Sequence, residues 1–342
     1  MAIAKGYSPT VSVVVCTRDR PQQLDRCLAS LASLDYPTCH VLVVDNAPRD
    51  ERSREVALHW GVQYLIEPAR GLSRARNRGA RSSGSEIVAY IDDDAVPEPD
   101  WLMLLVRDFE DPRVAAVTGA ILPMRQNPGM TLQGEGTSLY RVEQGQRRAV
   151  GRETQGWFEI ANFGEMGDGS NMAFRHSVFD IWPGFDERLG RGAILNGGEE
   201  HYAFFSLIER GYLIVYNPGA IVRHPDPQTT QELRSRHLSV IATATAYVTY
   251  LAVEHPSCRG ALARYALDRL RGTTRPWVNR SARAATPVAP RWLTLLAILS
   301  GPWIYFRARM VVQTRTGRDE MLPQRLEANP MAGPALQDRT SS

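Results

Sequence analysis

Residues Ile87-Val-Ala-Tyr-Ile-Asp-Asp-Asp-Ala-Val-Pro97 form an apolar, strand-like run that closes on three consecutive carboxylates. Neighbouring carboxylates repel one another and resist removal from water, so a divalent cation is the economical reason for placing them together. In an extended chain Asp92 and Asp94 share one face and Asp93 points away. The run therefore predicts a site for Mg²⁺ or Mn²⁺. The competing interpretation is a solvated acidic turn before a helix around Trp101.

This run belongs to a series in which strand-like and helix-like segments alternate. Short apolar runs bounded by turn residues predict strands over residues 11–16, 41–45, 62–66, 87–91 and 114–118. Apolar residues at helical spacing predict helices over 24–34, 52–60 and 72–80. This β-α-β order predicts an α/β fold with a mostly parallel sheet and flanking helices, and places the ligand beyond the carboxyl ends of the strands.

The second half of the sequence is less regular. Residues 126–169 are rich in glycine and lack a clear period. The later segments predict helices over 176–182 and 199–210, two strands over 212–216 and 220–224, and a long helix over 233–271. The tail after residue 318 is polar and contains proline, which predicts disorder over 319–342.

Charge is distributed unevenly along the 342 residues. Residues 259–318 hold twelve arginines and one acid, a net charge of +11, which leaves the rest of the chain at −8 because the total is +3. Such a segment is typical of a surface that faces a membrane or another polyanion, although a solvated arginine-rich helix pair has the same composition. The apolar run Trp292–Phe306 is interrupted by Gly301 and Pro302 and is shorter than the roughly 20 residues that a spanning helix needs.

The cysteines indicate a reducing compartment. Cys16, Cys27, Cys39 and Cys258 form no CxxC pair and have no histidine at metal-ligand spacing, so neither a zinc site nor a disulfide framework is expected. The first ten residues lack the apolar stretch of a signal peptide. We therefore expect a cytoplasmic protein, with the basic segment placing it on the inner face of a membrane as a further option.

Four segments, taken together, resemble family-2 glycosyltransferases with the GT-A fold. Asp92-Asp-Asp94 followed by Pro97 is similar to the DxD motif of that family. The other three segments are similar to its nucleotide-binding turn, its second strand and its GxxxARNxG helix, and they lie in the order Val11–Pro21, Val43–Asn46 and Gly71–Gly79. The resemblance covers roughly residues 10–225. It implies a GT-A domain over 1–228, with a donor half at 10–125 and an acceptor half at 126–228, followed by a basic helical region at 229–318.

The resemblance also implies donor-binding roles. Thr17 and Arg20 are expected to meet the uridine or ribose, and Asp45 to accept a base N–H. Arg76 or Asn77 is expected to reach the ribose or diphosphate. Asp92 and Asp93 complete the donor site. The metal ligands are expected to be Asp94, Asp92 and His224, the last of which closes a predicted strand; an isolated histidine is equally typical of a hydrogen-bonded structural residue.

The acceptor side is expected from three further segments that resemble the family: Gly169–Arg175, Gly184–Arg188 and Gly197–His201. They suggest Asn171 and Asp186 as acceptor-binding residues and Glu200 as the general base, with Glu199 as the alternative base. A carboxylate in the first turn of a helix is stabilised in its charged form by free N–H groups and the helix dipole. Two departures are Glu200, where the family has Asp, and Tyr202, where it often has an acid.

The sequence thus predicts an inverting enzyme that moves a hexose from a nucleotide sugar, with UDP favoured and dTDP or GDP open. The acceptor would be a hydroxyl of a glycan, a glycolipid or a small molecule, with peripheral membrane contact through the arginine-rich region. A sugar nucleotidyltransferase would need a glycine-rich loop after the first strand, which Cys16–Pro21 lacks. A non-catalytic sugar-nucleotide-binding relative is the other alternative. No nucleic-acid-binding module and no dinucleotide fingerprint are present.

Overall fold

The computed structural model describes residues 7–124, 146–163, 166–225, 229–271 and 288–319. Half of the glycine-rich stretch, and all of the predicted disordered tail except Asp319, lie outside these residues. Contacts within the chain define two units, residues 1–305 and 306–342. All the site residues discussed below belong to the first unit.

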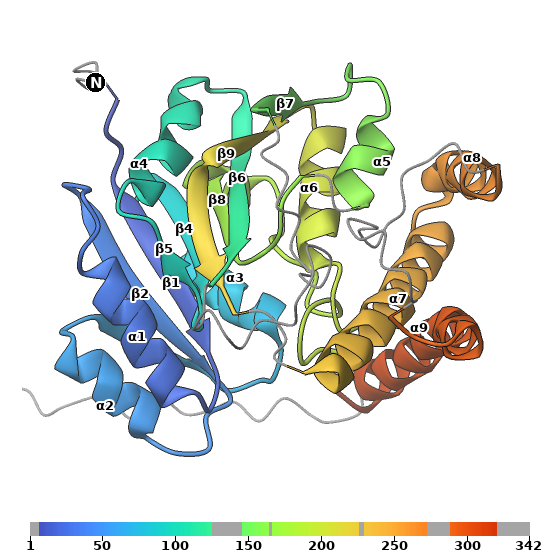
Figure 1. Ribbon diagram of the computed structural model, residues 1–342, viewed down its shortest axis with the longest axis horizontal. Coiled ribbons are helices and arrows are strands. Elements are labelled where there is room, and N and C mark those ends of the chain that lie inside the picture. Colours follow the sequence, from blue (N-terminus) through green and yellow to red (C-terminus); the bar gives the residue numbers. More distant parts are fainter. Residues whose placement is uncertain (1–6, 125–145, 164–165, 226–228, 272–287, 320–342) are drawn as a thin grey trace, which may run out of the picture. The chain divides into compact units, whose positions relative to one another are not determined.

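The described residues form an α/β structure (Figure 1). The strands are β1 Val11–Thr17, β2 Cys39–Asn46, β3 Gln63–Glu67, β4 Ile87–Asp92, β5 Val96–Pro97, β6 Val114–Pro123, β7 Arg148–Val150, β8 Asn171–Arg175 and β9 Leu213–His224. The helices are α1 Pro21–Leu31, α2 Arg52–His59, α3 Leu72–Ser82, α4 Trp101–Val106, α5 Trp157–Asn162, α6 Glu199–Glu209, α7 Thr230–Glu254, α8 Arg259–Leu270 and α9 Arg291–Asp319. Short 3-10 turns include His176–Asp180 and Pro256–Cys258.

The strands of the described residues build one nine-stranded sheet in the order β3-β2-β1-β4-β8-β6-β9-β5, with β7 paired to β9. Pairing is parallel from β3 to β4 and between β6 and β9. β8, β5 and β7 pair antiparallel with their neighbours. The predicted α/β class with flanking helices is confirmed, and the parallel part of the sheet is concentrated in its first half.

Both faces of the sheet are buried, as the continuous apolar strands predict. Val13 and Val15 of β1 point into a core shared with Leu24 of α1 and Trp101 of α4. Val14 points to the opposite face, where α3 comes so close that a Cβ on Gly79 would lie 2.5 Å from Val14 Cγ1. An aromatic cluster continues this second layer through Tyr90, Phe174, Phe185 and Phe204.

Two predicted boundaries were wrong. Residues 212–216 and 220–224 are not separate strands but parts of β9, whose pairing with β6 shifts register between Gly119 and Ala120. The predicted long helix over 233–271 ends at Glu254, and α8 begins at Arg259 after a 3-10 turn. Pro256 explains this break, since proline cannot donate to the helical hydrogen-bond ladder.

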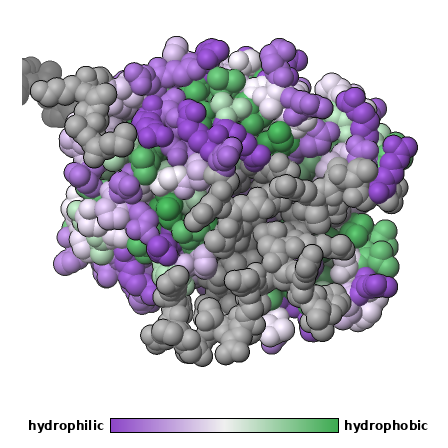
Figure 2. All heavy atoms as spheres, turned by 45° about the horizontal axis from the view of Figure 1, so that its top comes forward, coloured by the Kyte–Doolittle hydropathy of each residue, from purple (hydrophilic) through white to green (hydrophobic). Residues whose placement is uncertain are grey.

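Hydrophilic side chains surround small hydrophobic areas on the face shown in Figure 2. Among the described residues, no helix combines the length and the apolarity needed to cross a bilayer.

Candidate active site

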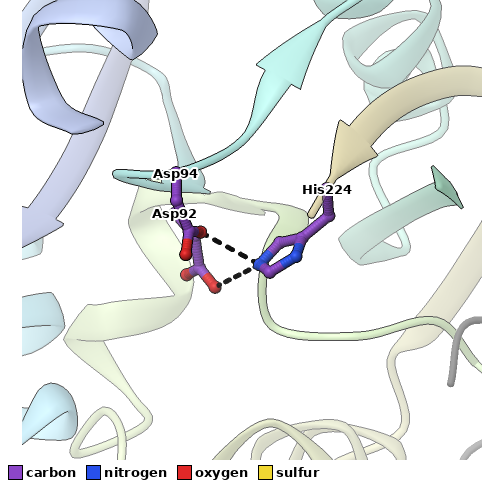
Figure 3. A group of neighbouring side chains, drawn as sticks. All are labelled: Asp92, Asp94 and His224. Carbon is purple, nitrogen blue, oxygen red and sulfur yellow. Dashed lines mark ion pairs between the residues drawn. The ribbon is translucent and has the colours of Figure 1, made fainter. Parts of the chain in front are cut away.

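The three aspartates after β4 divide into two groups. Asp92 and Asp94 both point toward His224, which ends β9 (Figure 3). His224 Nε2 lies 3.0 Å from Asp94 Oδ1 and 3.6 Å from Asp92 Oδ2. One ligand atom from each residue lies within 4.8 Å of the other two. The residues predicted as metal ligands therefore converge, and their two carboxylates are donors that suit Mn²⁺ or Mg²⁺.

Asp93 turns the other way, as the alternation of an extended chain predicts. Its Oδ2 accepts a 2.7 Å hydrogen bond from Thr17 Oγ1 at the end of β1, and its Oδ1 accepts one of 3.1 Å from Arg20 Nη1. Arg20 also donates to Asp94 Oδ2 at 3.1 Å. Burial raises the pKa of Asp93 to about 6, although Arg20 and Thr17 oppose this rise. Asp93 therefore ties the acidic turn to the first strand.

The electrostatics of the convergent trio favour a bound positive charge. Burial alone would lower the pKa of His224, but its hydrogen bonds and ion pairs with Asp92 and Asp94 outweigh burial and raise it to about 10. Burial would likewise raise the pKa of both aspartates, yet contact with His224 lowers them below their ordinary value. The carboxylates thus stay charged, and a cation bound by all three groups would take the place of the imidazolium proton.

Arg76 of α3 lies buried between the acidic turn and α6. Its Nη1 donates to Glu199 Oε1 at 2.8 Å and its Nη2 to the Gly169 carbonyl at 2.9 Å. Nη2 is also 4.0 Å from Asp92 Oδ1. Nearby Glu199 and Asp92 raise the pKa of Arg76 although burial opposes the rise. The guanidinium is therefore a fixed charge between the metal group and the start of α6.

Glu199 and Glu200 occupy different environments at the start of α6. Glu199 is 5% exposed and holds the ion pair with Arg76. Both carboxylates line the cavity, and Oε2 of each is buried without a hydrogen-bond partner among the described residues, but Glu200 has no ion pair with Arg76. Burial, followed by the charges of Glu199 and Asp168, raises the pKa of Glu200 well above its ordinary value. This direction is opposite to the one expected from the helix N-terminus, because burial and the neighbouring acids favour the uncharged form. Once ionised, a carboxylate with a raised pKa is a strong base.

Two residues predicted to bind the donor are held by hydrogen bonds within the protein. Asp45 at the end of β2 is fully buried and accepts a 3.0 Å hydrogen bond from Tyr64 Oη. Burial, the largest influence, raises the pKa of Asp45. Asn77 exchanges two hydrogen bonds with the backbone of Phe185, at 2.8 and 2.9 Å. Their donor-binding roles stay predictions.

The two residues predicted to bind the acceptor hold parts of the fold together. Asn171 is fully buried, accepts from Trp101 Nε1 at 2.8 Å, and donates to the carbonyls of Ala120 and Ala220. Asp186 forms an ion pair with Arg188 at 2.6 Å and accepts from Tyr250 Oη. Neither residue is among those that line the cavity. Their acceptor-binding roles also stay predictions.

A cavity of about 950 Å³ lies beside the acidic turn and the start of α6. It is lined by Thr17, Arg20, Asp92, Asp93, Arg76, Glu199, Glu200 and His224. Its volume lies in the range of about 300–1,000 Å³ that is typical of small-molecule sites. The cavity forms where parallel strands end, as the β-α-β order predicts.

Sequence reasoning missed one wall of this cavity. The side of α7 contributes it, through Ser235, Arg236, His237, Ser239, Val240, Thr243, Ala244 and Tyr247. Asp168, His201 and Arg191 are further lining residues that the sequence analysis did not assign. The only signal for α7 was its apolar helical stripe, which is equally typical of a helix packed on any surface.

Comparison with known proteins shows the family. The model of glycosyl transferase family 2 matches residues 12–182, half of the chain. The glucosyl-dolichyl phosphate glucuronosyltransferase of Haloferax volcanii is 28% identical over 63% of this chain and 68% of its own length. The pre-mycofactocin glycosyltransferase of Mycobacterium tuberculosis is 29% identical over 72% of this chain, which spans about half (48%) of that relative.

A solved structure agrees with the fold. The mannosyltransferase PcManGT from Pyrobaculum calidifontis, in complex with GDP-Man and Mn²⁺, superposes with a TM-score of 0.55 over 93% of this chain and 82% of its own, at 17% identity. Family match, curated relatives and fold thus converge on one conclusion. The chain belongs to glycosyltransferase family 2 and is a glycosyltransferase.

Proposed function

We propose that this enzyme transfers a hexose, with inversion, from a nucleoside-diphosphate sugar to a hydroxyl of a glycan, a glycolipid or a small molecule, and that UDP is the favoured nucleotide. The observation that carries the proposal is the convergence of Asp92, Asp94 and His224 at a cavity that Asp92, His224 and Glu200 line. A cation site and an available carboxylate in the same cavity match the two needs of the reaction, which are a neutralised diphosphate and an activated hydroxyl.

On the donor side, Asp92, Asp94 and His224 would hold Mn²⁺ or Mg²⁺. When bound, such an ion stabilises the negative charge that develops on the leaving diphosphate. Thr17 and Arg20 anchor the acidic turn through Asp93 and themselves line the cavity, so they are placed to contact the nucleotide. Arg20, which contacts Asp94 of the metal group, would add a positive charge near the diphosphate.

On the acceptor side, Glu200 in its ionised form would take the proton from the acceptor hydroxyl. The oxygen of that hydroxyl then attacks the anomeric carbon from the side opposite the diphosphate, which inverts the configuration. Glu199 is the weaker candidate, because its carboxylate is already paired with Arg76 at 2.8 Å. The ion pair would hold the start of α6, so that Glu200 faces the cavity.

We also propose that residues 1–228 make up the catalytic domain, that α7 completes its acceptor wall, and that the protein acts in the cytoplasm or on the inner face of a membrane. The boundary at residue 228 follows the sequence pattern. α7 begins after this boundary and lines the cavity, which supports a role for α7 together with the catalytic domain.

A panel of UDP-, GDP- and dTDP-sugars tests the proposed function, with released nucleotide as the readout. We expect one nucleotide sugar to be turned over in the presence of Mn²⁺ or Mg²⁺, and EDTA to stop the reaction. Asp94→Ala should remove the activity, whereas Asp50→Ala, at an exposed ion pair with Arg52, should keep it. Turnover that persists in EDTA would refute the proposed role of the metal.

A further inference from the structure

The first half of α9 presents its large apolar side chains to solvent. The exposed fractions are 62% for Trp292, 59% for Leu295, 55% for Leu296, 69% for Leu299 and 62% for Trp303. They recur at intervals of one, three or four residues, so they form one stripe along the helix, here called the outer stripe. A helix of a globular protein ordinarily turns such residues toward the core.

The opposite side of α9 fixes this orientation. Ala297, Gly301 and Tyr305 are buried. At Gly301 the helix comes so close to α7 that a Cβ would overlap Thr245. Tyr305 Oη also donates to Glu254 Oε1 of α7 at 2.7 Å. Gly301 and Tyr305 therefore face α7, and the residues of the outer stripe are left outside.

The outer stripe belongs to a segment of the sequence that is strongly basic. α9 has no acidic residue before Asp319, and Arg291, which is exposed, stands at its start. Residues 259–318 carry a net charge of +11. Tryptophan is enriched where hydrocarbon meets polar headgroups, and an apolar stripe in an arginine-rich segment is typical of a helix that lies in this interface.

We propose that the outer stripe docks on the surface of an anionic lipid bilayer, with α9 lying in the interface. Resting on the proposed function, the docking would bring the cavity to acceptors with a membrane-embedded tail. α7, which contacts α9 through Thr245, lines the cavity through Arg236 and Val240, both of which are exposed. The acceptor wall and the docking helix are thus joined directly.

Co-sedimentation of the full chain with vesicles tests the proposal. One set of vesicles contains phosphatidylcholine alone, and the other also contains phosphatidylglycerol. We expect roughly tenfold stronger binding to the anionic vesicles, because each arginine near the surface adds to the attraction. Leu295→Gln/Leu299→Gln should weaken this binding by at least roughly tenfold. The matched control is Leu58→Gln/Ile181→Gln, which changes exposed apolar residues outside α9 (63% and 54% exposed) and should bind like the wild type.

Equal binding of the stripe variant and the wild type would overturn the proposal, as would absence of binding to anionic vesicles. Light scattering adds another decisive result: a wild-type dimer that the stripe variant loses would assign the stripe to a second copy of the chain. Nucleotide release without vesicles separates the two hypotheses. Intact release without vesicle binding refutes only the docking, and vesicle binding without release from any nucleotide sugar refutes only the proposed transfer reaction.

Discussion

Asp94 makes the shortest contact with His224 within the candidate metal group, 3.0 Å, and also accepts a hydrogen bond from Arg20. We predict that Asp94→Ala weakens metal-dependent donor binding by roughly 100-fold or more, about 2.7 kcal/mol. The reason is that the cation would lose one of its carboxylate ligands while His224 and Asp92 remain. Calorimetric titration with UDP in the presence of Mn²⁺ measures this loss. Wild-type affinity in the variant would exclude Asp94 as a ligand.

Glu200 is the residue on which the chemical step is expected to depend. Glu200→Gln keeps the size of the side chain and removes its ability to accept a proton. We expect transfer to fall by about 10²–10⁴-fold, the usual contribution of a general base. Donor affinity should stay unchanged, since Glu200 is not one of the proposed metal ligands. Glu55→Gln, on the exposed side of α2, is the matched control. Unchanged transfer in Glu200→Gln would move the base elsewhere.

Glu200→Gln should also change how the stability of the protein depends on pH. The pKa of Glu200 is raised in the folded protein, so the folded state keeps a proton that the unfolded state releases. Stability is therefore lost as pH rises above the unfolded value of about 4.3. Glu200→Gln removes this loss. We expect its Tm to exceed that of the wild type at pH 8 and to match it near pH 4, measured by thermal unfolding in EDTA. A lower Tm at pH 8 would contradict the raised pKa.

At the scale of elements, Arg76 links α3 to α6 through Glu199. Arg76→Met leaves the Glu199 carboxylate buried without its partner, which should reduce the free energy of unfolding by about 3–5 kcal/mol. The double variant Arg76→Met/Glu199→Gln should recover part of this loss, because no unpaired charge then remains. Urea unfolding measures both effects. As a control, Arg52→Met, at an exposed ion pair, should leave the stability unchanged. Equal losses in the single and double variants would show that the ion pair is not the cause.

The elements of the first half could be predicted closely, because each signal is local. The strands predicted at 11–16 and 87–91 are observed as Val11–Thr17 and Ile87–Asp92. Apolar runs and helical spacing report on short stretches of chain, and there they agree with the tertiary structure. Prediction was weaker for β9, since the shift in its register depends on its partner β6.

At the scale of the whole molecule, a ligand that binds in the cavity should stabilise the folded state. A ligand that binds only the folded state at 100 times its Kd adds about 2.7 kcal/mol. We therefore expect UDP with Mn²⁺ to raise Tm by roughly 5 °C. Neither component alone should produce the full shift, because the carboxylates and the diphosphate are both negative and both need the cation. Thermal unfolding with and without EDTA measures this, and an identical shift in EDTA would contradict a metal-dependent donor site.

The sequence by itself determined the α/β class, the family and the three aspartates at the end of a strand, because these depend on local pattern and spacing. Only the tertiary structure decided which side chains meet. His224 joins Asp92 and Asp94 from a strand far along the chain. Glu199, and not Glu200, is paired with Arg76, and α7 supplies a wall that its sequence did not reveal. Such contacts depend on how distant elements pack, and no local period encodes that packing.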